Sequence, residues 1–164
     1  MRVYIPAVFS MLETLDSTRS MPVRNGWGFA ATPELTEFYS SGDQDEIEMI
    51  AFDDAALASL RLLAIGDESR FPHRRVVVSV DVEAEGMPDM GDSVVKLAGP
   101  ISLDDVAAIH VDVQEAEEAT KKAIENVDAA DLGDEDAELA VGDAQDNYMA
   151  FYDPTELPFL IELL

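Results

Sequence analysis

The sequence predicts an α/β protein, an α+β layered fold in which helices pack on a mixed sheet of about six strands. Residues 76–78 are three consecutive valines, and such a β-branched run is typical of a strand covered on both faces. Between residues 43 and 65 the apolar positions recur every three or four residues, as on one face of a helix. Strand-like and helix-like segments alternate along the whole chain, which favours stacked layers.

The first 85 residues are expected to alternate between strands and helices. Thr32 can cap a helix, and Pro33 at the first helical position loses no useful N–H. Pro6 and Pro154 are interpreted as helix starts of the same kind. The expected elements are a strand over 2–6, a helix over 7–15, a strand over 26–31, a helix from 32, a long helix over 43–65 and the valine-rich strand over 74–81.

The second half is expected to repeat this plan. Asp112 and Glu115 form a D-x-x-E variant of the capping box, which predicts a helix start. The strand over 93–98 is expected to pair with the valine-rich strand as a wide hairpin. The remaining expected elements are a helical turn at 102–105, a strand over 107–111, a short helix over 134–141, a strand over 147–152 and a final helix to the end.

These elements are expected to form one domain over residues 1–164. Its two halves, about 1–85 and 93–164, share a plan without an obvious sequence repeat. The favoured layout is a duplicated, ferredoxin-like or split βαβ arrangement. The alternative is a single open α/β sheet in three layers.

The formal net charge is -25 at pH 7, and it is concentrated towards the C-terminus. Residues 101–164 hold 18 Asp or Glu and two lysines, a net charge of -16. Such a field argues against partners that present phosphates, so neither nucleic acid nor a membrane is expected. The charge also fits solubility in a salt-rich or acid-tolerant cytoplasm, or mimicry of nucleic acid.

The chain contains no cysteine, which excludes disulfides and thiolate chemistry. The short apolar stretch at the N-terminus contains Pro6, ends at Glu13 and lacks a small-residue cleavage site, so a secretory signal is not expected. No apolar run approaches the roughly 18 residues of a membrane span. A cytoplasmic location is therefore expected.

A basic cluster stands out in this acidic chain, at the start of the valine-rich strand. One interpretation is an anion pocket. The other is that the arginines form ion pairs with acidic neighbours and reduce the repulsion between them. The cluster consists of Arg70, His73, Arg74 and Arg75.

Two weaker groups are candidates for binding. Asn25, Trp27 and Tyr39 could line a groove, although Trp27 between two glycines also fits a core position. The acidic segment could hold a cation, but it does not match the spacing of a calcium loop, so no firm metal site is expected. Its candidate ligands are Asp131, Asp134, Asp136 and Glu138.

Catalytic motifs give no support for an enzyme. There is no Gly-x-Ser-x-Gly and no phosphate-binding fingerprint, so no cofactor is expected. His73 and His110 are interpreted as structural or surface histidines. The leading hypothesis is a protein that acts by protein–protein contact or self-association. The alternatives are an anion-binding or small-ligand-binding protein, or an enzyme, that uses the basic cluster, and a metal-dependent role for the acidic segment.

Five stretches together resemble an uncharacterised actinobacterial protein family of about 160 residues, a domain of unknown function. They are MRVYIP at 1–6, FAATPEL at 29–35, RRVVV at 74–78, GDEDA at 133–137 and YDPTELP at 152–158. The resemblance covers nearly the full length. It implies no activity and no catalytic residues.

Overall fold

The computed structural model describes residues 1–163 and confirms the α/β class. The elements are β1 (Arg2–Ala7), α1 (Phe9–Thr18), β2 (Ser20–Met21), β3 (Trp27–Phe29), α2 (Pro33–Phe38), α3 (Gln44–Ala64), β4 (Val76–Asp81), β5 (Glu85–Gly86), β6 (Val94–Lys96), β7 (Ile101–Ser102), β8 (Val106–Asp112), α4 (Glu117–Asp131), α5 (Glu135–Gln145), β9 (Met149–Tyr152) and α6 (Leu157–Glu162). Four 3-10 turns cover Arg24–Gly26, Leu103–Asp105, Gln114–Ala116 and Pro154–Glu156.

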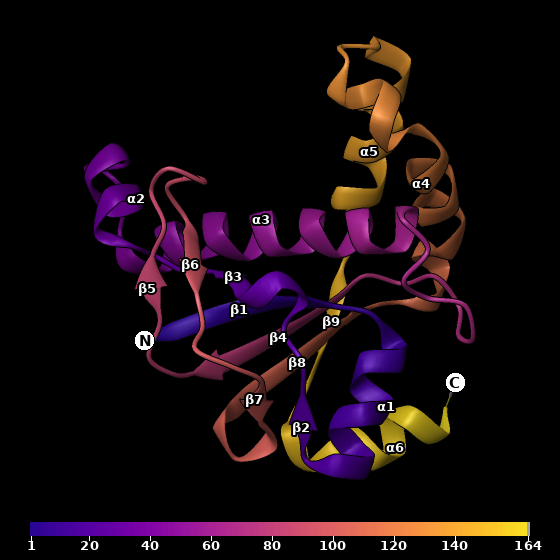
Figure 1. Cartoon of the computed structure of the whole chain (residues 1–164). Helices are drawn as coiled ribbons and strands as arrows, with labels where there is room; N and C mark the ends of the chain where they lie inside the picture. The colour runs from indigo at the N-terminus through magenta and orange to yellow at the C-terminus, as the bar shows by residue number, and fades with distance from the viewer. Residues whose placement is uncertain (164) are drawn as a thin grey trace.

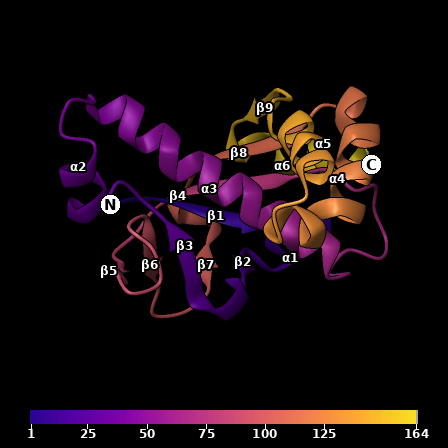
Figure 2. The same ribbon diagram turned by 90° about the horizontal axis from the view of Figure 1, so that it is seen from above.

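Seven strands form the main sheet in the order β5-β6-β3-β1-β4-β8-β9, and β2 pairs with β7 in a separate ribbon. Helices lie on both faces: α3 and the α4–α5 hairpin on one, and α1 and α6 on the other (Figure 1). The view from above shows α3 running across the strands (Figure 2). Every pairing described is antiparallel, whereas about six strands in a mixed sheet were expected.

The valine-rich strand β4 lies inside the sheet, between β1 and β8. It pairs with β1 along its whole length, from Arg2 opposite Asp81 to Ala7 opposite Val76. Both sides of β4 are therefore occupied, and the expected hairpin between β4 and the strand near residue 94 does not form. That strand, β6, pairs with β3 and β5 instead.

Alternate residues of the strands face two different cores. Val76, Val78 and Val80 join α1 and α6 in the larger apolar cluster, while Val77 joins Tyr4 in the cluster beneath α3. The larger cluster consists of fully or nearly fully buried side chains, among them Val3, Ile5, Phe9, Leu12, Leu15, Ile109, Leu157 and Leu160. The cluster under α3 is smaller and relies on alanines, which let the helix approach the sheet closely.

Gly28 in β3 permits a close approach between β3 and the side chains of β1. A Cβ atom at this position would lie 2.7 Å from Val3 Cγ1 and 2.9 Å from Ile5 Cδ1. Both contacts are far inside normal van der Waals separation, so a larger side chain would push β3 away from the side chains of β1.

Most of the predicted helix caps are confirmed. The Thr32 hydroxyl accepts a hydrogen bond from the N–H of Leu35 at 3.1 Å, as a cap of α2. Asp153 and Glu156 form a reciprocal capping box at the 3-10 turn that precedes α6. Further side-chain caps are Asp43 before α3, Ser102 before the 3-10 turn and Asp134 before α5.

The predicted helix start at Asp112 is wrong. Asp112 is the last residue of β8, it is buried, and its carboxylate accepts hydrogen bonds from Arg75. Helix α4 begins only at Glu117, after a 3-10 turn. The buried guanidinium needs a counter-charge, and this need takes the carboxylate away from any capping role.

Pro6 was expected at a helix start but lies inside β1, opposite Val77. The missing N–H is tolerated there because β3 pairs with β1 only at Tyr4 and leaves that side of Pro6 open. Helix α1 consequently starts at Phe9, and Val8 at its N-cap supplies no side-chain hydrogen bond.

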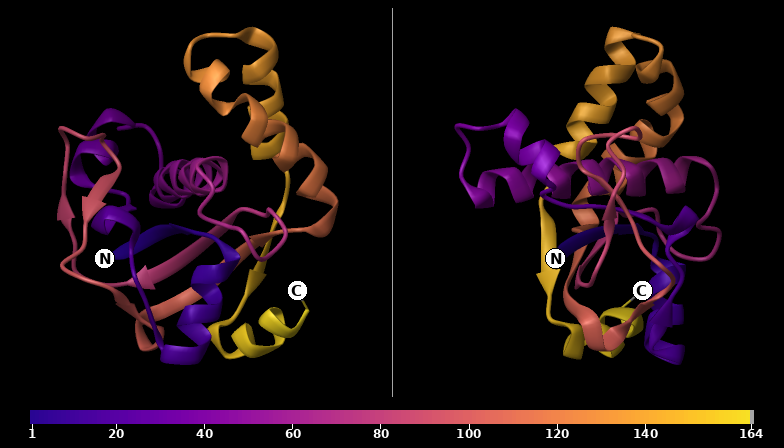
Figure 3. Two further views of the ribbon diagram at one scale, coloured as in Figure 1. Left: turned by 45° about the vertical axis from the view of Figure 1, so that its right-hand side comes forward. Right: turned by 60° about the vertical axis from the view of Figure 1, so that its left-hand side comes forward.

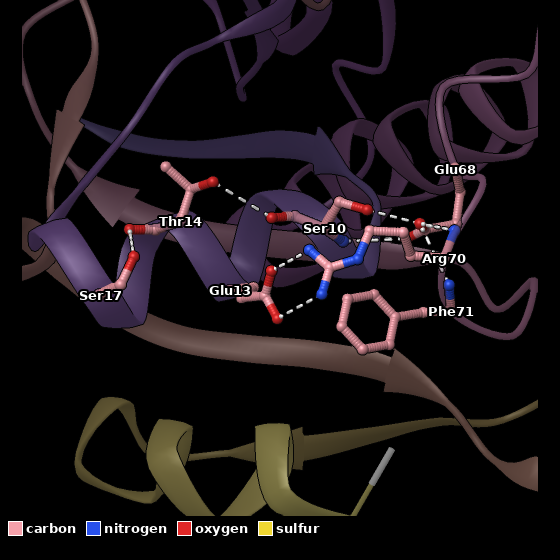
Figure 4. A network of polar contacts seen from close by, with 7 residues as sticks. All are labelled: Ser10, Glu13, Thr14, Ser17, Glu68, Arg70 and Phe71. Atoms are coloured by element: carbon pink, nitrogen blue, oxygen red, sulfur yellow. Dashed lines mark hydrogen bonds and ion pairs between the residues drawn. The ribbon is translucent and has the colours of Figure 1, made fainter.

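The buried carboxylate of Glu68 provides that missing cap from a distant loop (Figure 4). It accepts hydrogen bonds from the N–H of Ser10 at 2.8 Å and from the Ser10 hydroxyl at 2.5 Å. The N–H groups of Arg70 and Phe71 donate to the same carboxylate. Glu68 therefore fixes the loop after α3 against the first turn of α1.

None of the helices within residues 1–163 has the length and apolar character that crossing a lipid bilayer requires.

Candidate functional site

A cleft of about 480 Å³ opens on the α3 face of the sheet. Its floor consists of residues from β1, β4 and β8, one wall is α3, and the other wall is formed by the end of α5 and by β9. Side chains of Arg2 and Arg75 also contribute to it. The lining residues are Arg2, Tyr4, Asp45, Glu48, Met49, Phe52, Asp53, Ala56, Arg75, Ser79, Ala108, His110, Gln145, Asn147, Tyr148, Met149 and Phe151.

The cleft exists because the apolar cover of this face is incomplete. Helix α3 packs over β1, β3 and β4, and its buried residues reach only Tyr4 and Val77 on the floor. Beyond them the strands present Ser79 and His110 instead of further valines. Polar groups on a half-covered floor keep the cleft open to water.

Ser79 and His110 form the polar centre of the floor. Ser79 Oγ lies 2.9 Å from His110 Nε2. Burial lowers the pKa of His110 to about 4, and the positive charge of Arg2 adds to this effect. The imidazole is therefore neutral at pH 7, and one of its ring nitrogens carries no proton and can accept a hydrogen bond.

Aromatic rings surround His110 on two sides. The ring of Phe52 packs edge-on at a centroid distance of 4.8 Å, and that of Phe151 at 5.8 Å. Phe52 also contacts Tyr4 edge-on at 5.7 Å. These rings give the cleft an apolar middle section above its polar floor.

Negative charge lies along the α3 wall. Asp45, Glu48 and Asp53 all line the cleft, and no ion pair among residues 1–163 involves any of them. Burial raises the pKa of Asp53, and the charge of Asp54 adds to that rise. Burial together with the charge of Glu48 raises the pKa of Tyr4 to about 12. No ion pair within residues 1–163 neutralises the carboxylates of this wall, although the charge of Arg75 lowers the pKa of Asp53.

The two arginines of the lining are already paired. Arg2 Nε donates to Asp81 at 2.7 Å at the outer end of the floor. At the inner end Arg75 is fully buried and donates to both carboxylate oxygens of Asp112, at 2.9 and 2.7 Å. Neither guanidinium offsets the charge of the α3 wall by direct contact.

Arg75 also fixes the wall opposite α3. Its Nη1 donates to the side-chain oxygen of Gln145 at 2.6 Å, and its Nη2 donates to the backbone oxygen of Asn147 at 3.2 Å. Gln145 in turn lies within hydrogen-bond distance, 3.4 Å, of the backbone oxygen of Asp53 on α3. One guanidinium thus joins β4, β8, the end of α5 and the segment that leads into β9.

The structure distributes the predicted basic cluster among separate partners. Arg70 pairs with Glu13 at 2.5 Å, as Figure 4 shows, and Arg74 pairs with Glu117 at 2.7 Å. The ring of His73 lies 3.2 Å from the backbone oxygen of Glu68. Only Arg75 of the four lines the cleft, so the four side chains do not converge on one cavity.

The three groove candidates are not brought together either. Tyr39 is partly exposed after α2, with its ring against Phe38, and lines a shallow depression between α2, α3 and the turn before β6. Asn25 and Trp27 do not contribute to that depression. Asn25 has a φ of 57°, the left-handed conformation that turns require, and Trp27 is half-buried in β3.

The four acidic residues predicted as candidate cation ligands do not form a common site. Asp131 pairs with Arg61 at 2.5 Å, and Asp134 caps α5. Asp136 lines a depression between α4 and α5, and Glu138 lies in the first turn of α5. Within residues 1–163 no group of three or more His, Asp or Glu side chains is arranged to hold a metal ion.

Sequence reasoning missed the residues that make up the cleft. The alternation along 76–81 placed Ser79 on the face opposite Val78 and Val80, which was the one available signal. His110 was interpreted by itself, because nothing in the sequence pairs position 79 with a strand 30 residues later. The register, Ser79 opposite Ala108 and Val77 opposite His110, brings the two polar groups together diagonally.

Comparison with known families gives an assignment for almost the whole chain. Residues 1–161 match a family of unknown function, DUF6912. The chain belongs to DUF6912. The predicted resemblance to a domain of unknown function is thereby confirmed, and membership in DUF6912 assigns no activity to the cleft. No curated protein and no solved structure matches the chain.

Proposed function

We propose that this DUF6912 protein binds a small organic cation, a compound with a protonated amine and an aromatic or apolar body, in the cleft beneath α3. The volume of about 480 Å³ suits one such molecule, since ligand pockets commonly measure roughly 300–1,000 Å³. The lining combines apolar rings with a few convergent polar groups, as such sites do.

The charge of the α3 wall supports a cationic occupant. Glu48 and Asp53 are one turn and a half apart on α3 and both line the cleft, so an amine between them could contact either carboxylate. A bound cation favours the ionised form of Asp53, whose pKa is raised by burial and by the charge of Asp54. An anionic ligand would meet repulsion from the same groups.

The rings support an aromatic or apolar body. Phe52 and Phe151 flank His110, and Met49 and Met149 add flexible apolar surface. A cation near the face of such a ring gains a further about 0.5–2 kcal/mol. The neutral His110 imidazole can accept a hydrogen bond from an N–H or O–H of the ligand.

The observation that carries this proposal is that α3 carboxylates without an ion pair and the rings of Phe52 and Phe151 line one cleft. Ligand-observed NMR with tryptamine and indole-3-acetate tests it, because the two probes share a ring system and differ in the sign of their charge. Tryptamine is expected to show saturation transfer from the protein and indole-3-acetate to show none. Equal transfer to both probes, or transfer to the acetate alone, contradicts the proposal.

Isosteric substitutions locate the binding. Glu48→Gln and Asp53→Asn remove charge and keep size, and each is expected to weaken tryptamine binding by up to about 5-fold, the effect of losing one partly screened charge contact. Asp136→Asn changes net charge equally on the exposed α4–α5 hairpin and serves as the matched control. If the control weakens binding as much, the probe responds to net charge and not to the cleft.

Three further predictions stay with this proposal. A cytoplasmic location is expected from the sequence, and an actinobacterial origin from the resemblance to the uncharacterised family. Fractionation of the native host, with the protein followed by antibody, tests the location directly. An anion at the cluster of Arg70, His73, Arg74 and Arg75 also stays a prediction, which titration with inorganic phosphate tests.

A further inference from the structure

The two edges of the main sheet differ in how they meet solvent. The edge strand β5 has two residues, Glu85 and Gly86, and carries a charge. The opposite edge strand β9 has four residues, and no residue from 147 to 152 is charged. In a chain of net charge -25, this is an unusual stretch to leave at an edge.

Natural sheets protect long edges with charges, prolines or very short strands, because exposed backbone groups pair readily with another strand. The edge at β5 shows two of these protections, its short length and its charge, whereas the edge at β9 shows neither. Figure 3 shows β9 at the margin of the sheet, and within residues 1–163 it pairs only with β8.

The hydrogen-bond pattern identifies which backbone groups of β9 face outward. The backbone oxygen of Tyr148 accepts from Val113, so Tyr148 faces the β8 side, and Ala150 and Tyr152 share its direction. The N–H and C=O groups of Met149 and Phe151 therefore point away from the sheet. The side chains there are large and apolar: Phe151 is 61% exposed and Tyr148 next to the strand is 69% exposed.

We infer that β9 pairs with β9 of a second copy of this chain, which makes one continuous antiparallel sheet across a two-fold axis. An antiparallel edge is its own complement, so a two-fold axis at Ala150 places Met149 of each copy opposite Phe151 of the other. The four outward N–H and C=O groups of each copy then exchange four hydrogen bonds in total. Ala150 lies opposite its own counterpart in a non-hydrogen-bonded pair, where Cα atoms are about 4.5 Å apart.

A second copy fits this edge better than another kind of strand. In this register the exposed ring of Phe151 would lie beside the partner's Met149 and that of Tyr148 beside the partner's Tyr152, and the edge itself carries no charge to be buried. The remaining charge of the two chains opposes association at long range. Salt at about 1 M shortens the screening length to about 3 Å, so the association is expected to strengthen with salt.

Because the chain contains no cysteine, a single introduced cysteine reports the pairing without background. Ala150→Cys places two thiols at a separation within the roughly 4.4–6.8 Å range of Cα distances that a disulfide allows. Mild oxidation is expected to give a covalent dimer on a non-reducing gel. Glu85→Cys, on the edge strand β5, is the matched control and is expected to stay monomeric.

Sedimentation velocity on the unmodified chain supplies the second measurement, with and without added salt. The wild type is expected to reach twice the mass of one chain. Phe151→Pro removes an outward N–H while the bonds to β8 remain, and it is expected to be a monomer. Phe151→Val keeps the N–H and loses the ring, and it is expected to retain the dimer.

Three results overturn the inference. A wild type that stays monomeric at high concentration and high salt means that another partner or none covers the edge. Equal crosslinking by Ala150→Cys and Glu85→Cys means that collision and not pairing joins the chains. A dimer that survives Phe151→Pro, with circular dichroism unchanged, places the contact elsewhere.

Discussion

The two faces of the main sheet are made by alternate residues of the same strands, yet they differ in composition and in cover. On the α1 and α6 face, β4 contributes Val76, Val78 and Val80 to a continuous apolar core. On the α3 face, β4 contributes Val77 and Ser79 and Arg75 directly precedes the strand, and only Val77 lies under the helix. The closed face therefore supplies most of the apolar stabilisation, and the open face carries the groups that can meet a ligand.

One strand can contribute both to the stability of the core and to contact with a ligand, because its successive side chains point to opposite faces of the sheet. A substitution on one face should change stability and leave ligand binding unchanged, and a substitution on the rim of the other face should do the reverse. Four predictions test this separation, in order of decreasing effect.

The largest effect is expected from Asp112→Ala on the cleft face. It leaves the Arg75 guanidinium buried without its counter-charge, which costs about 3–5 kcal/mol. Urea unfolding followed by circular dichroism measures the change in free energy. Asp131→Ala breaks an exposed pair with Arg61 and should cost far less, because solvent screens exposed pairs. Similar costs for both variants would mean that the burial of the first pair contributes little.

A smaller cost, about 2–4 kcal/mol, is expected from Leu12→Ala on the closed face, since it leaves a cavity in a fully buried core. Tryptamine binding should not change, because Leu12 lies on the opposite side of the sheet.

Met49→Ala is the counterpart on the open face. Met49 is 57% exposed at the cleft, so the variant should keep its stability and bind tryptamine more weakly. A loss of binding in Leu12→Ala would show that the faces are coupled.

The third prediction concerns pH and His110. Its pKa is about 4 in the folded protein, against 6.5 for an unperturbed histidine, so between these values the unfolded chain binds more protons. Stability should therefore fall as the pH drops from 6.5 to 4, by up to about 3 kcal/mol from this group. Urea midpoints across this range measure it. His110→Gln should flatten the slope, and His73→Gln, at an exposed position, should keep it.

The smallest effect, about 1–3 kcal/mol, is expected from Glu68→Gln, which puts an amide donor against the N–H donors of Ser10, Arg70 and Phe71. Burial alone raises the pKa of Glu68, but these hydrogen bonds outweigh it and hold the pKa below its ordinary 4.5. The stabilisation is therefore present above pH 4.5 and is lost as the pH falls through the folded pKa. Thermal melts at pH 7 and pH 3 should differ less for Glu68→Gln than for the wild type.

Sequence patterns of a few consecutive residues were sufficient to predict most of the helices and strands. The valine run gave an interior strand, and Thr32, Asp43 and Asp153 gave helix starts, because each depends on residues within a few positions. Asp112 was misassigned for the complementary reason. Its role depends on Arg75, 37 residues away, and a capping pattern of four residues carries no information about a buried ion pair.

Apart from the alternation that set Ser79 opposite Val78 and Val80, no local signal in the sequence indicated the cleft. Its floor needs the register of β1, β4 and β8, and its second wall needs the position of α5 and β9, all of which arise from long-range pairing. The arginines near residue 70 were the most conspicuous polar group in the sequence, and three of them form ion pairs within the protein. Neutral His110 and uncharged Ser79 were less conspicuous, although they lie at the centre of the floor.

The contacts of Arg75 with residues far along the chain have a consequence for folding during synthesis on the ribosome. Its partners lie at positions 112, 145 and 147, so a nascent chain that ends before residue 145 lacks two of the groups that solvate this charge in the folded protein. Until those residues leave the exit tunnel, the guanidinium is better hydrated by water than buried beside β4. The inner end of the sheet is thus expected to close only after translation is nearly complete.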